Sequence, residues 1–197
     1  MHPDNENPVT LLEAYEREVP GAAARLAERA LRIALKTATG MLNDPERARD
    51  IAQDTAIDVL RNAHGIRHAE TLDAWIHRIA ARHTMRLIHR QRARSARETP
   101  LAELPELLEP HTADVPHDEA TRRERAAALN DAMSLLPPPQ RLAVVLRFVH
   151  DLSHEQVAEA MNIRPGSASA LISRGTAALR TIEALEGLED DEGLGER

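Results

Sequence analysis

The sequence predicts an all-α fold made of two small helical domains that are joined by an acidic linker containing prolines. Apolar residues recur three and four positions apart, as in amphipathic helices, and no segment alternates like a half-buried strand. Aromatic residues make up only 2% of the chain and hydrophobic residues 42%, so the cores must consist of aliphatic side chains and alanines, which suit helix contacts. Prolines and carboxylates interrupt the apolar pattern after residue 98. We therefore predict domains at 8–97 and 121–185, a linker at 98–120 and a disordered acidic tail at 186–197.

The first helices have recognisable starts and stops. The first dozen residues, with their prolines and asparagines, predict a frayed start. A helix is expected from Pro20 to Gly40, since proline is tolerated in a first turn and glycine often ends a helix. The next helix begins at Asp44, whose side chain can cap it, and Pro45 and Glu46 suit its first turn.

This second helix has one apolar and one polar face. Small and aliphatic residues form the apolar stripe, namely Ala48, Ile51, Ala52, Thr55, Ala56 and Val59. At about 100° per residue, Asp50, Gln53 and Asp54 fall on the opposite side. We expect these three side chains to be exposed to solvent.

The third helix, expected from Leu72 to about residue 94, carries a row of arginines. They recur at every fourth residue: Arg78, Arg82, Arg86, Arg90 and Arg94. Guanidinium groups on one helix repel each other unless an anionic partner, such as a phosphate backbone, lies across them. The alternative is a solvated row that pairs with acidic residues of the linker or of the first helices. Trp75, near the start of this helix, would either fill the core or stack on a base.

The C-terminal domain is expected to contain short helices. Residues 121–135 form one, which the three following prolines end, and residues 140–150 form another. A capping box of Ser153 and Gln156 opens a third helix, which runs to Met161.

The last two helices fit a helix-turn-helix. Ala158 is small enough for a close crossing, and Asn162 suits the tight turn because asparagine tolerates positive φ. Pro165 opens the last helix, in which Ala168 and Ile172 are apolar anchors. This spacing predicts DNA binding, and a simple αα-hairpin with the same spacing is the alternative.

Charge and composition narrow the class of protein. The net charge is −7, but carboxylates concentrate in the linker and tail and arginines in the third helix, so binding to nucleic acid is not excluded. The chain has no cysteine, which excludes disulfides, thiolate zinc sites and cysteine nucleophiles. We find no signal peptide and no apolar run of roughly 20 residues, so we expect a cytoplasmic protein without membrane insertion.

A metal hydrolase is the alternative from a different class. His154 and Glu155 begin like a zinc-binding helix motif, but Ala158 takes the place of the second histidine. His64 and His68 are four residues apart in an expected loop, with no third ligand evident. We therefore predict no catalytic residue, no metal and no cofactor, and expect that the protein is not an enzyme.

Two blocks of the sequence resemble the extracytoplasmic-function (ECF) sigma factors of bacterial RNA polymerase. RARDIAQD at 47–54 and WIHRIA at 75–80 look like region two of that family, whereas LPPPQR at 136–141, LSHEQVAE at 152–159 and IRPGS at 163–167 look like region four. The order of the blocks and the acidic linker between them also match. The resemblance implies a factor that directs promoter recognition and transcription initiation.

The resemblance also implies roles for individual residues. Asp50, Gln53 and Asp54 would bind the β′ clamp helices of the polymerase core. The minus-ten promoter element would be contacted by Trp75, Arg78, Arg82, Arg86 and Arg90. The minus-thirty-five element would be contacted by the helix-turn-helix residues Arg164, Ser167, Ser169 and Arg174. The family further implies contact with the polymerase β flap and an anti-sigma factor as a regulatory partner.

The chain departs from the family pattern in both blocks. Arg82 and Arg86 stand where the family commonly has asparagine and aspartate, and Ser169 and Leu171 stand where its recognition helix usually carries lysine and arginine. Each lost bidentate contact would weaken recognition by about 1–3 kcal/mol. This motivates a second hypothesis, a sigma-like regulatory protein that binds polymerase but has lost selective promoter reading.

Overall fold

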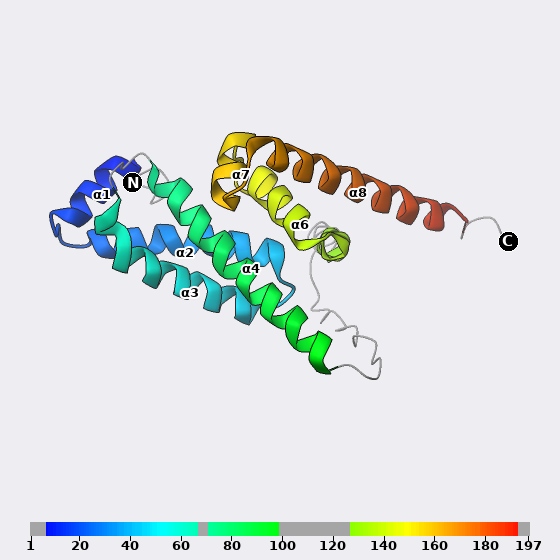
Figure 1. Ribbon diagram of the computed structural model, residues 1–197, viewed down its shortest axis with the longest axis horizontal. Coiled ribbons are helices and arrows are strands. Elements are labelled where there is room, and N and C mark those ends of the chain that lie inside the picture. The colour runs from blue at the N-terminus through cyan, green and yellow to red at the C-terminus, as the bar shows by residue number, and fades with distance from the viewer. Residues whose placement is uncertain (1–6, 67–70, 99–126, 193–197) are drawn as a thin grey trace, which may run out of the picture.

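The computed structural model describes residues 7–66, 71–98 and 127–192 (Figure 1). These residues form helices and no strand, which confirms the all-α prediction. They group into an N-terminal domain, from α1 to α4, and a C-terminal domain, from residue 127 to α8. The linker predicted at 98–120 lies outside the described residues apart from Glu98, so the predicted boundaries stay predictions.

The N-terminal domain is a bundle in which α2, α3 and α4 pack against one another (Figure 1). Its elements are α1 (Pro8–Glu16), α2 (Ala22–Met41), α3 (Pro45–Asn62), the 3-10 turn η2 (Ala63–Gly65) and α4 (Leu72–Glu98). Ala34 of α2, Ala52 of α3 and Ala80 of α4 are buried together. Small side chains at such contacts let helix axes approach closely. The expectation of a core rich in alanine and aliphatic residues is confirmed.

The start of the chain differs from the prediction of a frayed segment, because α1 begins at Pro8. The side chain of Asn7 caps this helix by accepting a hydrogen bond from the Val9 amide at 2.9 Å. Leu11 and Leu12 are buried, so α1 is held by tertiary packing that a local reading of polar residues misses.

Helix α3 forms as predicted. The side chain of Asp44 accepts a hydrogen bond from the Arg47 amide at 3.0 Å, and Pro45 occupies the first turn. The predicted stripe is buried in full, from Ala48 to Val59. One face of α3 is therefore used entirely in packing, which fixes the direction of the opposite face.

The C-terminal domain consists of a helix over residues 127–135, α6 (Pro138–Val144), the π-helical turn η4 (Val145–Val149), α7 (His154–Met161) and α8 (Pro165–Glu192). Residues 121–126 of the predicted first helix lie outside the described residues. The prolines do not only end that helix: Pro138 opens α6, two residues before the predicted start, because a first helical turn needs no amide hydrogen at that position.

The helix-turn-helix is confirmed in its local geometry. Ser153 and Gln156 form both hydrogen bonds of the capping box at the start of α7. Asn162 lies in the left-handed region with φ of 54° and ends α7. Ala158, Ala168 and Ile172 are buried where α7 and α8 cross.

The predicted disordered tail is wrong for residues 186–192, which continue α8 as far as Glu192. This stretch contains no proline, and leucine and glutamate are good helix formers. The single glycine, Gly187, costs about 1 kcal/mol, which is too little to end a helix by itself. Residues 193–197 lie outside the described residues.

Two histidines meet where the domains touch. His77 of α4 and His150, which follows η4, make an edge-on ring contact with centroids 4.6 Å apart. His150 Nε2 also lies 2.9 Å from the Thr37 hydroxyl. Burial lowers the pKa of both rings from 6.5 to about 4. The nearby charges of Asp73 and Arg29 act on the pKa of His77 in opposite directions. His77 and Lys36 further lower that of His150.

We predict that acid destabilises the fold through these two rings. The unfolded chain binds protons near pH 6.5 and the folded chain only near pH 4. The free energy of unfolding should therefore fall as pH drops from about 6.5 to about 4, by roughly 1–3 kcal/mol. Urea unfolding across this range measures the loss. The double variant His77→Gln, His150→Gln should lose clearly less over the same window. An equal loss would assign the effect to other groups.

We also predict that a methyl group at Gly175 destabilises the packing of α8 against α6. A Cβ atom there would lie 2.6 Å from Val144 Cγ2 and 3.3 Å from the Gln140 carbonyl oxygen of α6. Gly175→Ala should lower the free energy of unfolding by about 1–2 kcal/mol, even though alanine favours the helix. Gly166→Ala is the matched control in the same helix, since its Cβ would meet no atom within 4 Å. If both variants are equally stable, the close packing of α6 on α8 is not as described.

Candidate functional site

The carboxylate face of α3 lies where the sequence places it. Asp50, Gln53 and Asp54 are all exposed, on the side opposite the buried stripe. The carboxylate groups take no part in the core, whereas Ala48, Ile51 and Ala52 of the same helix do.

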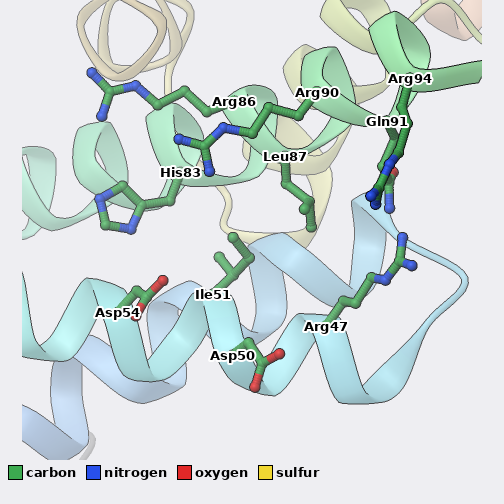
Figure 2. Close-up of a pocket in the computed structure, with 10 residues that line it drawn as sticks. All are labelled: Arg47, Asp50, Ile51, Asp54, His83, Arg86, Leu87, Arg90, Gln91 and Arg94. Atoms are coloured by element: carbon green, nitrogen blue, oxygen red, sulfur yellow. The ribbon is translucent and has the colours of Figure 1, made fainter. Parts of the chain in front are cut away.

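A groove of about 550 Å³ runs between α3 and α4 beside this face (Figure 2). Asp50 and Asp54 line it from α3, and Arg86 and Arg90 line it from α4. Figure 2 shows Arg47 of α3 near Gln91 and Arg94 of α4 at one end of the groove. The fold brings the second half of the arginine row next to the carboxylates.

Asp58 is a site residue that the sequence analysis missed. Its carboxylate Oδ2 lies 2.9 Å from His83 Nε2 and 3.7 Å from Arg82 Nη2, both on α4. It extends the series Asp50 and Asp54 by four residues, so it lies on the same side of α3. That spacing is the signal by which the sequence could have identified it.

The first half of α4 lies beside a second hollow, of about 420 Å³. Trp75 and Arg78 line it together with Thr71 and with residues at the end of α3 and around η2. Trp75 is half-buried and packs against the N-terminal core, so it serves the core while keeping one side accessible. The two interpretations of this residue are therefore compatible.

The arginine row is not left unpaired. Arg78 Nη2 donates to Glu159 Oε1 of α7 at 2.9 Å, and Arg82 lies within ion-pair distance of Asp58. Both arginine side chains remain about half exposed, so these pairs are weak, on the order of 0–1 kcal/mol, and can exchange for other anions. The alternative of pairing with acidic residues of the first helices holds for Arg82, and Arg78 pairs with an acid from the other domain.

The recognition residues of the helix-turn-helix all face solvent. Arg164, Ser167, Ser169 and Arg174 are exposed at the start of α8 and along its first turns. Leu171 is different, because it is half-buried and packs against the core of the C-terminal domain. Its apolar side chain is therefore explained by packing. Of the two departures from the family pattern in this helix, only Ser169 places a residue without positive charge at an exposed position.

Of the two histidine motifs, the structure describes His64, His154 and Glu155. Within the described residues, no group of three or more histidines or carboxylates is arranged to hold a metal ion. His64 lies against the ring of Tyr15, with centroids 4.9 Å apart, and His68 lies outside the described residues. In the described part of the chain, no helix is long and apolar enough to cross a membrane.

Comparison with known proteins finds two family matches that cover both domains. Residues 26–94 match the model of sigma-70 region 2, and residues 126–179 match that of sigma-70 region 4. The RNA polymerase sigma-E factor of Streptomyces antibioticus is 31% identical over 150 residues, which cover 74% of this chain and 76% of the relative. The ECF sigma factor SigE of Mycolicibacterium smegmatis is also 31% identical, over 83% of this chain and 60% of its own length.

Solved structures support the same fold. The complex of CnrH with the cytosolic domain of CnrY matches 91% of this chain and 99% of the solved chain, with a TM-score of 0.63 and 17% identity. The complex of the sigma factor RpoE with the anti-sigma factor NepR from Bartonella quintana matches 79% of this chain and 92% of the solved chain, with a TM-score of 0.57 and 18% identity.

These matches, in the predicted order along the chain, identify the class of protein. The chain belongs to the sigma-70 family of RNA polymerase sigma factors, in its ECF group. It is thus a transcription initiation factor that binds the RNA polymerase core and promoter DNA. The second hypothesis, a sigma-like protein that has lost promoter reading, is not favoured by these relatives.

Proposed function

We propose that this sigma factor docks on the polymerase β′ clamp helices through α3 and reads the promoter through α4 and α8. The docking residues are Asp50, Gln53 and Asp54. The minus-ten residues are Trp75, Arg78, Arg82, Arg86 and Arg90, and the minus-thirty-five residues are Arg164, Ser167, Ser169 and Arg174. The observation that carries the proposal is the exposure of Asp50 and Asp54 on a helix whose opposite face is fully buried.

The α3 face suits a basic protein surface. Its carboxylates are held on a rigid helix, so little side-chain and backbone freedom is lost on docking. Complementary charge mainly speeds the encounter and fixes the register of the complex. The same groove is lined by Arg86 and Arg90. Their positive charge repels a cationic partner that approaches α4.

The α4 residues suit opened DNA. Trp75 offers an accessible aromatic ring beside Arg78, and a ring next to a guanidinium group is a common platform for an unstacked base and its phosphate. Arg82 shares Asp58 with His83, so a phosphate can replace that partner at small cost.

The minus-thirty-five residues support a weaker recognition of DNA than the α4 residues do, and part of this recognition is mediated by water. Two of the four are serines, which bind bases or phosphates only by single hydrogen bonds. Arg164 and Arg174 supply the charge. We propose that α8 still enters the major groove and that α4 provides the larger share of promoter affinity. The β flap of the polymerase is the proposed protein contact of this domain.

An anti-sigma protein is the proposed regulatory partner. Both matched solved structures contain a partner protein, which in one is named as an anti-sigma factor. The C-terminal domain also exposes the apolar side chains Leu129, Leu135, Phe148 and Val149, which a partner protein could cover. We further propose that the protein performs no chemistry of its own and acts in the cytoplasm, where it lends specificity to the polymerase.

We predict that reversing two charges on α3 weakens binding to the polymerase core. Asp50→Arg with Asp54→Arg should reduce the affinity about ten-fold or more, mainly through a slower association rate. Fluorescence anisotropy of labelled protein titrated with core enzyme measures this change. Glu13→Arg with Glu28→Arg alters the net charge equally at exposed sites on α1 and α2, and it should leave the affinity nearly unchanged. Equal effects of the two double variants would show that only net charge matters.

We also predict that Arg174 contributes a phosphate contact. Arg174→Ala should lower affinity for duplex minus-thirty-five DNA and reduce the slope of log affinity against log salt by about 0.9. Titrations at several salt concentrations give the slope. Arg61→Ala removes an exposed arginine at the end of α3 and should leave the slope as in the wild type. An unchanged slope for Arg174→Ala would remove this residue from the interface.

A further inference from the structure

Arg141 of α6 is a charged side chain that the fold buries where the two domains meet. It is only 7% exposed. Its Nε donates to the Gly40 carbonyl oxygen at 2.8 Å, and its Nη2 donates to Asn43 Oδ1 at 3.2 Å. Both acceptors belong to the N-terminal domain, so this side chain forms hydrogen bonds across the contact between the domains.

The described hydrogen-bond partners of this guanidinium group are both uncharged amide oxygens. Gly40 lies in the last turn of α2, where the negative end of the helix dipole supplies about half an elementary charge. A buried ion costs free energy unless an opposite charge lies next to it, and burial lowers the pKa of Arg141 for the same reason. Part of the positive charge of Arg141 is therefore available to an anion.

A hollow of about 200 Å³ lies beside Arg141. Its other polar lining residues come from the α2–α3 connection, from α4 and from the helix over residues 127–135: Asn43, Gln91, Arg92 and Ser134. None of the described residues that line the hollow is acidic. A space of this size has room for several water molecules, at about 30 Å³ each, and so for one tetrahedral oxyanion.

The polar residues of the hollow contribute in different ways. Arg141 is held by its two hydrogen bonds, so it loses little freedom when an anion binds. Arg92 is exposed and adds a second guanidinium group, whose planar fork of N–H donors suits oxyanions. The Ser134 hydroxyl already donates to the Asp131 carbonyl oxygen at 2.6 Å, so it bounds the hollow without offering its hydrogen to an anion. The two arginines are therefore the charged donors of the hollow.

We propose that this hollow binds a phosphate-sized oxyanion between Arg141 and Arg92. The ligand is inorganic phosphate or the phosphate group of a small phosphomonoester, because both present charged oxygens in the same tetrahedral arrangement. None of the residues that line the hollow is among those proposed for polymerase docking or promoter contact, so the site goes beyond the proposed function. Its walls come from both domains, so a bound anion contacts each of them.

Thermal unfolding of the full chain in phosphate tests the proposal. Two charge-assisted hydrogen bonds correspond to a Kd on the order of 1 mM. At about 20 mM phosphate, this Kd raises the Tm by about 4–7 °C relative to sodium chloride of equal ionic strength. Isothermal titration calorimetry with phosphate gives the Kd directly. An unchanged Tm together with no heat of binding would overturn the proposal.

A phosphomonoester distinguishes the two sources of the ligand. Glycerol 3-phosphate is added at the same concentration and ionic strength as inorganic phosphate. An equal rise in Tm shows that the hollow accepts an esterified phosphate as well as the free ion. A rise with inorganic phosphate alone assigns the site to the free ion.

Variants at exposed positions locate the site without disturbing the buried arginine. Arg92→Gln should lose at least half of the rise in Tm that phosphate causes, because it removes one of the two charged donors. Arg61→Gln removes the same charge at an exposed site at the end of α3 and should keep the full rise. If Arg92→Gln also keeps the full rise, the anion binds elsewhere and the proposal fails.

A built-in carboxylate provides an independent test. Asn43→Asp keeps an oxygen that can accept from Arg141 Nη2, and its negative charge replaces the bound anion and repels phosphate. We expect at least ten-fold weaker phosphate binding by this variant in the titration. Asn62→Asp adds the same charge at an exposed position at the other end of α3 and should bind phosphate as the wild type does. Equal phosphate affinity of the two variants would place the anion away from Asn43 and contradict the proposed site.

Discussion

Close packing of α2, α3 and α4 through small residues is the constraint on which the functional surfaces depend. Because alanines occupy the contacts between these helices, their axes can approach closely, while the carboxylates of α3 and the arginines of α4 lie on the outer faces. The packing of the three helices therefore sets where the carboxylates of α3 and the arginines of α4 leave the backbone. A bulky substitution at Ala52 or Ala80 would move both surfaces, although neither residue lies in a binding face.

The contact between the two domains also depends on a small residue, Gly40, and on one buried arginine, Arg141. Gly40 and Val145 fit because one has no side chain, and Arg141 uses the end of α2 as its partner in place of a carboxylate. These contacts combine close apolar packing with hydrogen bonds, so they define one arrangement of the two domains.

Much of this structure could be predicted from the sequence because its signals are local. The cap at Asp44, the capping box at Ser153 and the turn at Asn162 each depend on residues within one helical turn, and all are found as expected. Some features that the sequence analysis missed depend on distant contacts. Helix α1 needs the core that buries Leu11 and Leu12, and the packing of Leu171 is set by other helices. No pattern along the chain could show that Glu159 would pair with Arg78, because they are 81 residues apart.

In the proposed function, the mixed groove between α3 and α4 couples polymerase docking on its aspartate side with DNA binding on its arginine side. Asp50 and Asp54 lower the electrostatic potential around Arg86 and Arg90, so they weaken attraction of nucleic acid to this part of α4. A basic protein that covers the aspartates removes that opposing field and so increases the attraction. By linkage, nucleic acid bound at the arginines must strengthen the protein contact by the same factor. In the proposed function, this coupling favours the ternary complex over either binary one and does not set the order in which the partners bind.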